Sequence, residues 1–135
     1  MRIQILGTAA AEAWPGLFCG CDICNRARAT GGKDLRSRAS LQIDDNYKID
    51  LPPDTYLHTI RYGLDLSRIK YLFFTHSHGD HFSPDELEYL RPGFAHNVVN
   101  APVEVYANEK VASALDVRAQ SHADWPVRIK RLKPF

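Results

Sequence analysis

The sequence predicts a single domain of the mixed α/β or α+β class. The chain has 135 residues, which is the size of one ordinary domain. It is 44% hydrophobic and 24% charged, close to the composition of globular proteins that bury a core. Short apolar runs typical of strands are interspersed with segments that carry helix signals, and no repeat or flexible linker divides the chain. We therefore expect residues 1–135 to form one sheet packed against helices.

The first part of the chain carries signals for one strand, one helix and a hairpin. Apolar residues alternate over Arg2–Gly7, which predicts a strand. A short helix is expected over Asp22–Ala29, with Asp22 as its N-cap and a Gly-Gly pair just beyond its end. The runs Ala39–Ile43 and Tyr47–Leu51 flank an Asp-Asp-Asn turn, which predicts a hairpin.

The middle of the chain predicts a helix, a buried strand and a second helix. Pro53–Tyr62 has the pattern of a helix that ends at Gly63. The apolar, β-rich run within Lys70–Thr75 is typical of a buried strand. Ser83 can cap the next helix, with Glu86 completing a capping box.

The last part of the chain predicts two strands with a helix between them. Val103–Ala107 and Val127–Leu132 have strand composition. Asn108 can cap a helix that runs to about Leu115.

Charge and hydropathy exclude several functional classes. The formal net charge is +1, so the chain as a whole is not drawn to nucleic acid or to an acidic membrane. The longest apolar runs are too short to cross a bilayer, and residues 1–16 lack the apolar core of a secretory signal. We expect a cytoplasmic protein with no membrane partner.

The segment Phe74–Phe82 concentrates metal-ligating side chains directly after the predicted buried strand. It places His76, His78, Asp80 and His81 within six residues. Imidazole and carboxylate suit divalent zinc, manganese or iron. In an extended start the first two histidines point to the same side, and a turn brings the other pair to a second position. We expect two metals sharing a bridging water, roughly 3.5–4 Å apart.

Three cysteines form a second cluster. Cys19, Cys21 and Cys24 lie within six residues and are the full complement of cysteines in the chain. An odd number disfavours a disulfide framework, and thiols this close in a cytosolic protein more often share a metal.

These motifs together resemble a known family. The pattern His76-x-His78-x-Asp80-His81 after an apolar strand resembles the signature of the metallo-β-lactamase superfamily of metal-dependent hydrolases. Residues 6–10 resemble the first strand and glycine turn of that family, and residues 48–50 resemble its early strand that ends in an aspartate. The cysteine pattern followed by Arg-Ala-Arg is similar to the phosphoribosyl cyclic phosphodiesterase branch. The implied fold is the N-terminal half of an αββα sandwich.

The resemblance implies a role for each site residue. His76 and His78 would bind the first metal, and Asp80 and His81 the second, with catalysis depending on Asp80. A dinuclear metal-bound hydroxide, on zinc or manganese, would attack a small phosphodiester. Asp50 would orient the histidine segment from behind, although a simple turn aspartate before two prolines fits this position equally well.

The resemblance also implies a structural zinc on Cys19, Cys21 and Cys24, and further metal ligands beyond residue 135. We expect the chain to be a truncated N-terminal part that is inactive alone and exposes an apolar sheet face suited to a homodimer. His96 and His122 are candidate surrogate ligands, whereas His58 is expected on a helix surface.

Two alternative functions stay open. An RNA-processing endonuclease of the same superfamily would need a basic arm, for which the one candidate is the run Arg128–Lys133. The same run also fits an edge strand protected by charge, so nucleic acid is not favoured as a partner. The other alternative is a metal-binding module without catalysis. The sequence leaves the physiological substrate and the choice between zinc and manganese open.

Overall fold

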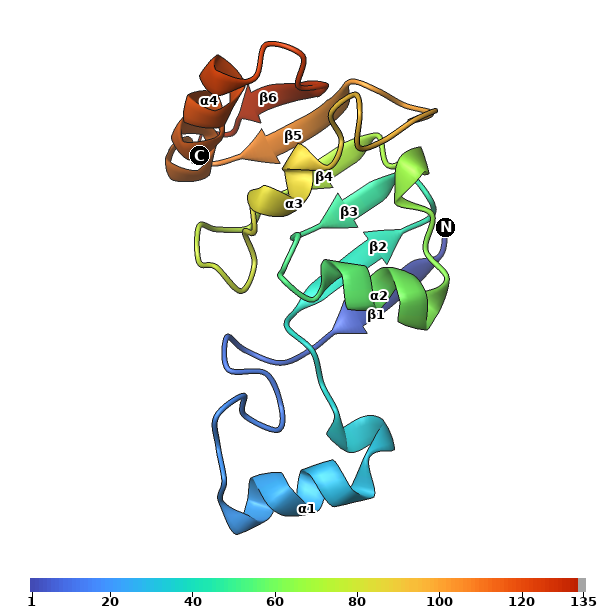
Figure 1. Cartoon of the computed structure of the whole chain (residues 1–135), viewed down its shortest axis with the longest axis vertical. Helices are drawn as coiled ribbons and strands as arrows, with labels where there is room; N and C mark the ends of the chain where they lie inside the picture. The colour runs from blue at the N-terminus through green and yellow to red at the C-terminus, as the bar shows by residue number, and fades with distance from the viewer. Residues whose placement is uncertain (134–135) are drawn as a thin grey trace.

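The computed structural model describes residues 1–133 and consists of one mixed sheet with helices packed on one of its faces (Figure 1). Within this range the strands are β1 (Ile3–Gly7), β2 (Ser40–Ile43), β3 (Tyr47–Ile49), β4 (Tyr71–Phe73), β5 (Val103–Ala107) and β6 (Val127–Arg131). The helices are α1 (Asp22–Thr30), η1 (Gly32–Asp34), α2 (Thr55–Tyr62), η2 (Leu66–Arg68), α3 (Asp85–Glu88) and α4 (Glu109–Ser121), of which η1 and η2 are 3₁₀ turns. The mixed α/β class predicted from the sequence is confirmed.

The strands lie side by side in sequence order, from β1 to β6. The first three pair antiparallel, and β3, β4, β5 and β6 pair parallel. The predicted hairpin is present, with Leu41 opposite Ile49. Because β3 and β4 are parallel, their carboxyl ends reach the same edge of the sheet. This edge brings residue 50 next to the histidine-rich segment.

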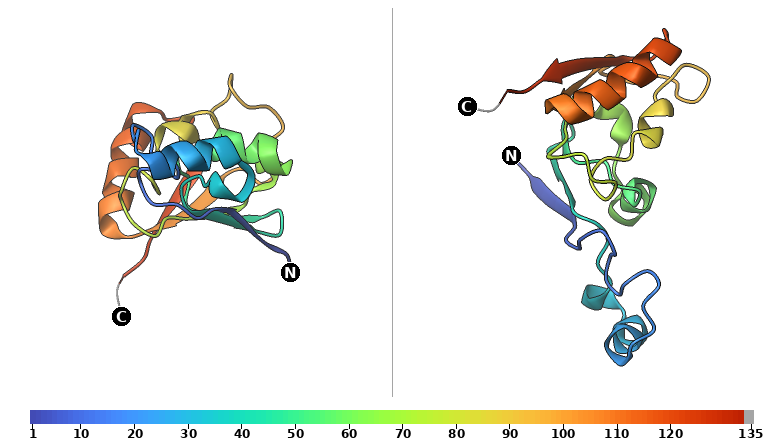
Figure 2. Two further views of the ribbon diagram at one scale, coloured as in Figure 1. Left: turned by 90° about the horizontal axis from the view of Figure 1, so that it is seen from below. Right: turned by 90° about the vertical axis from the view of Figure 1, so that its left-hand side faces the viewer.

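Helices α2, α3 and α4 cover one face of the sheet (Figure 2). The core lies between this face and the helices. It contains Leu72, Val105, Val111 and Leu115, each at most 2% exposed. Trp125 closes the core near α3 and donates its indole N–H to the Leu87 carbonyl at 2.8 Å. Removal of this apolar surface from water is the main source of stability in the unit.

The other face of the sheet has no helix against it within residues 1–133 (Figure 2). Cross-strand partners share this open face, which carries the charged pair Glu104 and Arg128 near β6 and is otherwise an apolar and aromatic surface. It consists of Ile3, Ile5, Leu41, Ile43, Tyr47, Ile49, Tyr71, Phe73 and Tyr106. The Tyr47 and Tyr71 rings stack at 4.9 Å between centroids, as do Phe73 and Tyr106. Ile5 is 63% exposed, so this face is available for packing.

Residues 10–36 leave the sheet between β1 and β2 and form a separate projection that holds α1 and the three cysteines (Figure 1). We call this projection the Cys lobe. At its junction with the sheet, the Ser37 carbonyl accepts hydrogen bonds from Thr8 N and Ala9 N at 3.0 and 2.9 Å. Gly7 is required here, because a Cβ at that position would lie 2.0 Å from the Arg38 carbonyl oxygen.

Two predicted caps are wrong. Cys21, not Asp22, is the N-cap of α1, and it makes no side-chain capping bond. Helix α3 spans Asp85–Glu88 only, and Pro84 rather than Ser83 is its N-cap. The Ser83 backbone N–H donates to the Leu51 carbonyl, so it is not free for the bond to the Glu86 side chain that a capping box requires.

The predicted surface position of His58 is also wrong. His58 lies on the inner side of α2 and is fully buried, with its Nε2 2.7 Å from the Ser37 Oγ. Burial, with the charge of Lys48 nearby, lowers the pKa of His58 to about 4, so the ring is neutral at physiological pH. Its Nδ1 has no hydrogen-bond partner among the described residues. His58 therefore joins α2 to the junction between the sheet and the Cys lobe. It does not lie on the solvent-exposed face of the helix.

Candidate metal centre

The candidate metal centre is the loop that follows β4, residues 75–82, which we call the metal loop. After the strand the backbone folds back, because His81 N and Phe82 N both donate to the His78 carbonyl, at 3.0 and 2.8 Å. The returning segment is then fixed to the end of β3 by a bond from Leu51 N to the His81 carbonyl. This turn returns His81 to the neighbourhood of His76.

Asp50 supports the metal loop from the sheet. It is 4% exposed and has a positive φ of 58°, a conformation that is uncommon for non-glycine residues but that aspartate tolerates better than most. Its carboxylate accepts from the Thr75 backbone N–H at 2.8 Å and from the Thr75 hydroxyl. It also lies 2.6 Å from the His81 Nδ1. The geometry therefore places Asp50 behind the loop rather than in a simple turn.

These contacts fix the Nδ1 side of the His81 ring, whose Nε2 lies 3.3 Å from the Asp80 carboxylate. With the His81 Nδ1 on Asp50, the Nε2 lone pair is available to a metal, which is the usual arrangement of a ligating histidine. The His76 Nδ1 similarly lies 3.0 Å from the Thr75 hydroxyl. Sequence reasoning missed Thr75, although its position directly before the first histidine was a signal for it.

The structure brings three of the four predicted ligands together. His76, Asp80 and His81 each offer one ligand atom, and these atoms lie within 4.8 Å of one another. The His78 ring lies outside this group but contacts His76, with 4.7 Å between ring centroids. The grouping thus differs from the predicted pairing of His76 with His78. Two imidazoles and a carboxylate at this spacing fit a divalent cation such as zinc or manganese after small side-chain adjustments.

The three cysteines form a second metal-capable group in the Cys lobe. Their sulfur atoms lie within 4.8 Å of one another, with Cys19 and Cys21 at 3.4 Å. Hydrogen bonds from the Cys24 backbone and the Cys19 side chain lower the pKa of Cys21 to about 7. Arg28 holds the loop by donating to the carbonyls of Gly16 and Cys19. The thiol spacing and the lowered pKa suit thiolate ligation of zinc.

The later histidines stand apart from both groups in the described part of the chain. His96 is exposed in a loop, and His122 lies 3.9 Å from the Glu88 carboxylate.

Most of the basic run Arg128–Lys133 forms the edge strand β6. Arg128 pairs with Glu104, and Arg131 pairs with Glu109 and Asp116, so carboxylates offset part of its charge.

Solved structures of known proteins share the fold of this chain. A diphosphatase of the PhnP family is 26% identical with a TM-score of 0.70, and the match covers 97% of this chain and 50% of that one. Zinc-bound PqqB from Methylobacterium extorquens is 20% identical with a TM-score of 0.71, over 99% and 47% of the two chains. Human tRNase Z, short form, is 20% identical with a TM-score of 0.64, over 100% and 46%. No family model and no curated protein matches the chain.

The chain therefore carries the metallo-β-lactamase fold, and the resemblance seen in the sequence is confirmed. It spans about half the length of the solved structures that it matches. In residues 1–133 no helix is both long and apolar enough to traverse a lipid bilayer.

Proposed function

We propose that this chain is part of a divalent-metal-dependent hydrolase that cleaves a phosphodiester. The observation that carries the proposal is the convergence of His76, Asp80 and His81 at the carboxyl end of β4. Side chains of this kind, held from behind by a buried carboxylate, are suited to catalysis rather than to packing.

The residues divide into ligands and supports. His76, Asp80 and His81 would hold the metal, with His78 beside them as the fourth ligand that the resemblance implies. Divalent ions bound here would activate water and stabilise the negative charge that develops at phosphorus. Asp50 and Thr75 keep the ligands in place by fixing the Nδ1 side of His81 and His76.

The substrate proposal is supported by the diphosphatase match at 26% identity and by the cysteine pattern of the cyclic phosphodiesterase branch. Diphosphates and phosphodiesters share the attack of an activated water on phosphorus. In this proposal, catalytic activity requires a protein of the full family length. The resemblance implies that the second half of the fold supplies further metal ligands. The 135-residue chain alone is expected to hydrolyse such substrates only very slowly.

The Cys lobe is proposed to hold one structural zinc on Cys19, Cys21 and Cys24. Three thiolates and a fourth ligand complete the tetrahedral geometry that zinc prefers. All three cysteines are free thiols, which agrees with the reducing cytoplasm as the proposed location. The open face is the proposed site of a homodimer contact in the isolated chain.

Metal analysis and a phosphodiesterase assay test the proposal together. We expect a protein of the full family length that contains this chain to hold about three metals and to hydrolyse bis(4-nitrophenyl) phosphate, and the 135-residue chain alone to hold about one metal. Tight metal binding without turnover would instead favour a non-catalytic metal-binding module. Cleavage of precursor RNA in place of the aryl ester would favour the endonuclease.

A further inference from the structure

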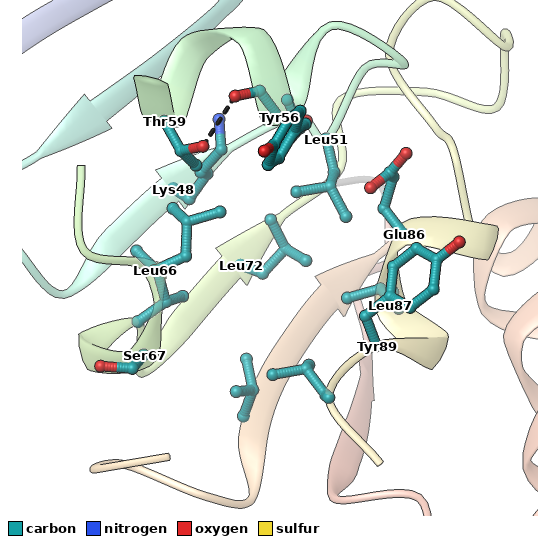
Figure 3. A pocket seen from close by; sticks show the side chains of 14 residues that line it. Lys48, Leu51, Tyr56, Thr59, Leu66, Ser67, Leu72, Glu86, Leu87 and Tyr89 are labelled. Carbon is teal, nitrogen blue, oxygen red and sulfur yellow. Dashed lines mark hydrogen bonds between the residues drawn. The ribbon is translucent and has the colours of Figure 1, made fainter. Parts of the chain in front are cut away.

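Two hollows lie away from the metal loop, and they differ in the side chains that line them. The first, on the helix-covered face of the sheet, has mainly apolar walls, and neither a cysteine nor a histidine lines it (Figure 3). The second lies in the Cys lobe, has a volume of about 840 Å³ and is lined by all three cysteines. Apolar and aromatic side chains surround the thiols there, namely Trp14, Leu17, Phe18 and Ile23. A hollow of this size admits a small molecule, so a reactant from solution can reach nucleophilic sulfur.

The three thiols differ in their access to solvent. Cys21 is exposed and Cys19 is half-buried, whereas Cys24 is buried at 3% exposure. A reagent in the hollow therefore meets the Cys21 sulfur first. The Cys24 sulfur is shielded from solvent but lies within 4.8 Å of the other two sulfur atoms. This arrangement suits a pair in which the exposed thiol attacks a reagent and the buried thiol resolves the product.

Helix α1 sets the spacing between the exposed and the buried thiol. Cys21 is the N-cap of this helix and Cys24 is its third residue. The side chain of an N-cap residue reaches toward the third helical residue, as it does in a capping box. The two sulfurs therefore belong to a Cys-x-x-Cys pair at a helix N-terminus, which is the arrangement of redox-active dithiols.

Cys19 and Arg28 support the exposed thiol. The Cys19 thiol donates a hydrogen bond to the Cys21 sulfur at 3.4 Å. Arg28 donates to the carbonyls of Gly16 and Cys19, at 3.0 and 2.6 Å, which fixes a cation beside the cluster. Among residues 1–133 no carboxylate forms an ion pair with this guanidinium within 4.0 Å. Its charge therefore favours the approach of an anionic reagent.

We propose that Cys21 and Cys24 form a redox-active dithiol that is oxidised by a small anionic disulfide such as glutathione disulfide. The Cys21 thiolate attacks one sulfur of the reagent, which forms a mixed disulfide and releases one glutathione thiolate. The Cys24 thiolate then attacks the Cys21 sulfur and releases the second glutathione thiolate. The chain loses two electrons and gains an internal disulfide. Glutathione disulfide is reduced, and the two cysteine protons pass through water to the two glutathione sulfurs.

Oxidation and zinc binding at the Cys lobe then exclude each other, a consequence that rests on the zinc site proposed above. The disulfide removes two of the three thiolates, and the Cys19 thiolate alone does not make a tetrahedral zinc site. Bound zinc in turn occupies the sulfur lone pairs that would attack the reagent. The Cys lobe is thus either reduced and able to bind zinc, or oxidised and free of it.

Thiol counting and disulfide mapping on the metal-free 135-residue chain test the dithiol by itself. In excess glutathione disulfide, two of the three thiols should be lost, the mass should fall by about 2 Da, and peptide mapping should join Cys21 to Cys24. Cys19→Ser should still form this disulfide. The double variant Cys19→Ser, Cys24→Ser should instead stop at the mixed disulfide, because no resolving thiol remains. A wild-type chain that stops at the mixed disulfide, or that joins Cys19 to Cys21, would overturn the proposal.

Concentrated urea separates a dithiol organised by the fold from one that any flexible peptide would form. The equilibrium constant for disulfide formation with glutathione should fall at least about tenfold in urea, because α1 no longer holds the two sulfurs together. Equal constants in the folded and unfolded chain would overturn the proposal. Ile23→Ser is the matched control, since it changes an exposed residue between the two cysteines and should leave the folded-state constant unchanged.

The zinc-loaded chain distinguishes this proposal from the zinc site on which its consequence rests. Zinc added before glutathione disulfide should slow thiol loss at least about tenfold, and a chromophoric chelator should detect zinc release in step with disulfide formation. A Cys21–Cys24 disulfide that forms equally fast with and without zinc would support the dithiol and contradict the zinc site. Slow thiol loss in both samples would overturn the dithiol and leave the zinc site unaffected.

Discussion

The metal loop and the Cys lobe both gather metal-ligating side chains, but the fold supports them differently. In the metal loop, buried Asp50 at the end of β3 fixes Thr75 and His81 from behind. In the Cys lobe, the supporting bonds come from Arg28 and Asn25 within the lobe itself. The first site is organised by the sheet before any metal arrives, whereas the second depends on local contacts. We therefore expect metal to stabilise the Cys lobe more than it stabilises the metal loop.

The largest expected effect is on turnover. If the proposed phosphodiester hydrolysis is observed, Asp80→Ala should reduce it to background, because it removes a ligand from the group at the metal loop. The matched control is Asp34→Ala, which removes an exposed carboxylate from η1 in the Cys lobe. Retained turnover in the Asp80 variant would rule out the dinuclear mechanism.

The next effect concerns the support behind the loop. Asp50→Asn should weaken metal binding at the metal loop about 10- to 100-fold, because the amide is a poorer acceptor for the His81 Nδ1. Competition with a chromophoric chelator measures this affinity. Asp54→Asn is the control, since Asp54 pairs with Arg38 instead of the loop. Equal affinities in the two variants would contradict the supporting role of Asp50.

The junction between sheet and Cys lobe should respond to acid. The pKa of His58 is about 4 in the folded chain and near 6.5 when unfolded, so between these values the unfolded chain binds more protons. Stability is therefore full above about pH 6.5 and falls as the pH approaches 4. This single group should cost about 2 kcal/mol between pH 7 and pH 5.

Urea unfolding at the two pH values measures this loss. His58→Gln should be less sensitive to pH than the wild type, whereas His96→Gln, at an exposed position, should behave like the wild type. If the His58 variant loses as much unfolding free energy between pH 7 and pH 5 as the wild type, another group dominates the response to acid.

The smallest effect on global stability is expected from Cys21→Ser. It should remove one zinc per chain and increase hydrogen exchange in α1, with little change in the sheet, because α1 lies outside the main core. The control is Ile23→Ser, which changes an exposed residue between two cysteines without removing a thiol. Increased exchange that spreads through β3 and β4 would show that the lobe and the sheet unfold together.

The sequence predicted the strands well, because alternation and β-branched runs report directly on a sheet. Val103–Ala107 is confirmed at the predicted bounds, and the Asn108 cap is confirmed by its hydrogen bond from Val111 N. Helix α4 runs on to Ser121, six residues past the predicted end, because no breaking residue follows Leu115. Local signals of this kind are sufficient where a single segment determines its own conformation.

Features that depend on contacts between distant segments were not predictable in the same way. His58 is polar and lies in a short helix, so only the packing of α2 on Ser37 shows that it is buried. Ser83 and Glu86 have the sequence of a capping box, but the Ser83 backbone N–H that the box needs is bonded to Leu51 of a distant segment. The four-ligand motif was visible in the sequence, whereas the grouping of His76 with Asp80 and His81 depends on the turn at His78.

The open face of the sheet also has a consequence for colloidal behaviour. With a net charge of +1, two copies of the chain meet almost no long-range repulsion at neutral pH. Short-range attraction between their stacked tyrosines and exposed isoleucines then dominates, so this face limits solubility and the screening of charge by salt has little effect on it. A single acidic substitution at Ile5 would raise solubility more than several charges placed elsewhere, since it acts inside the attractive surface.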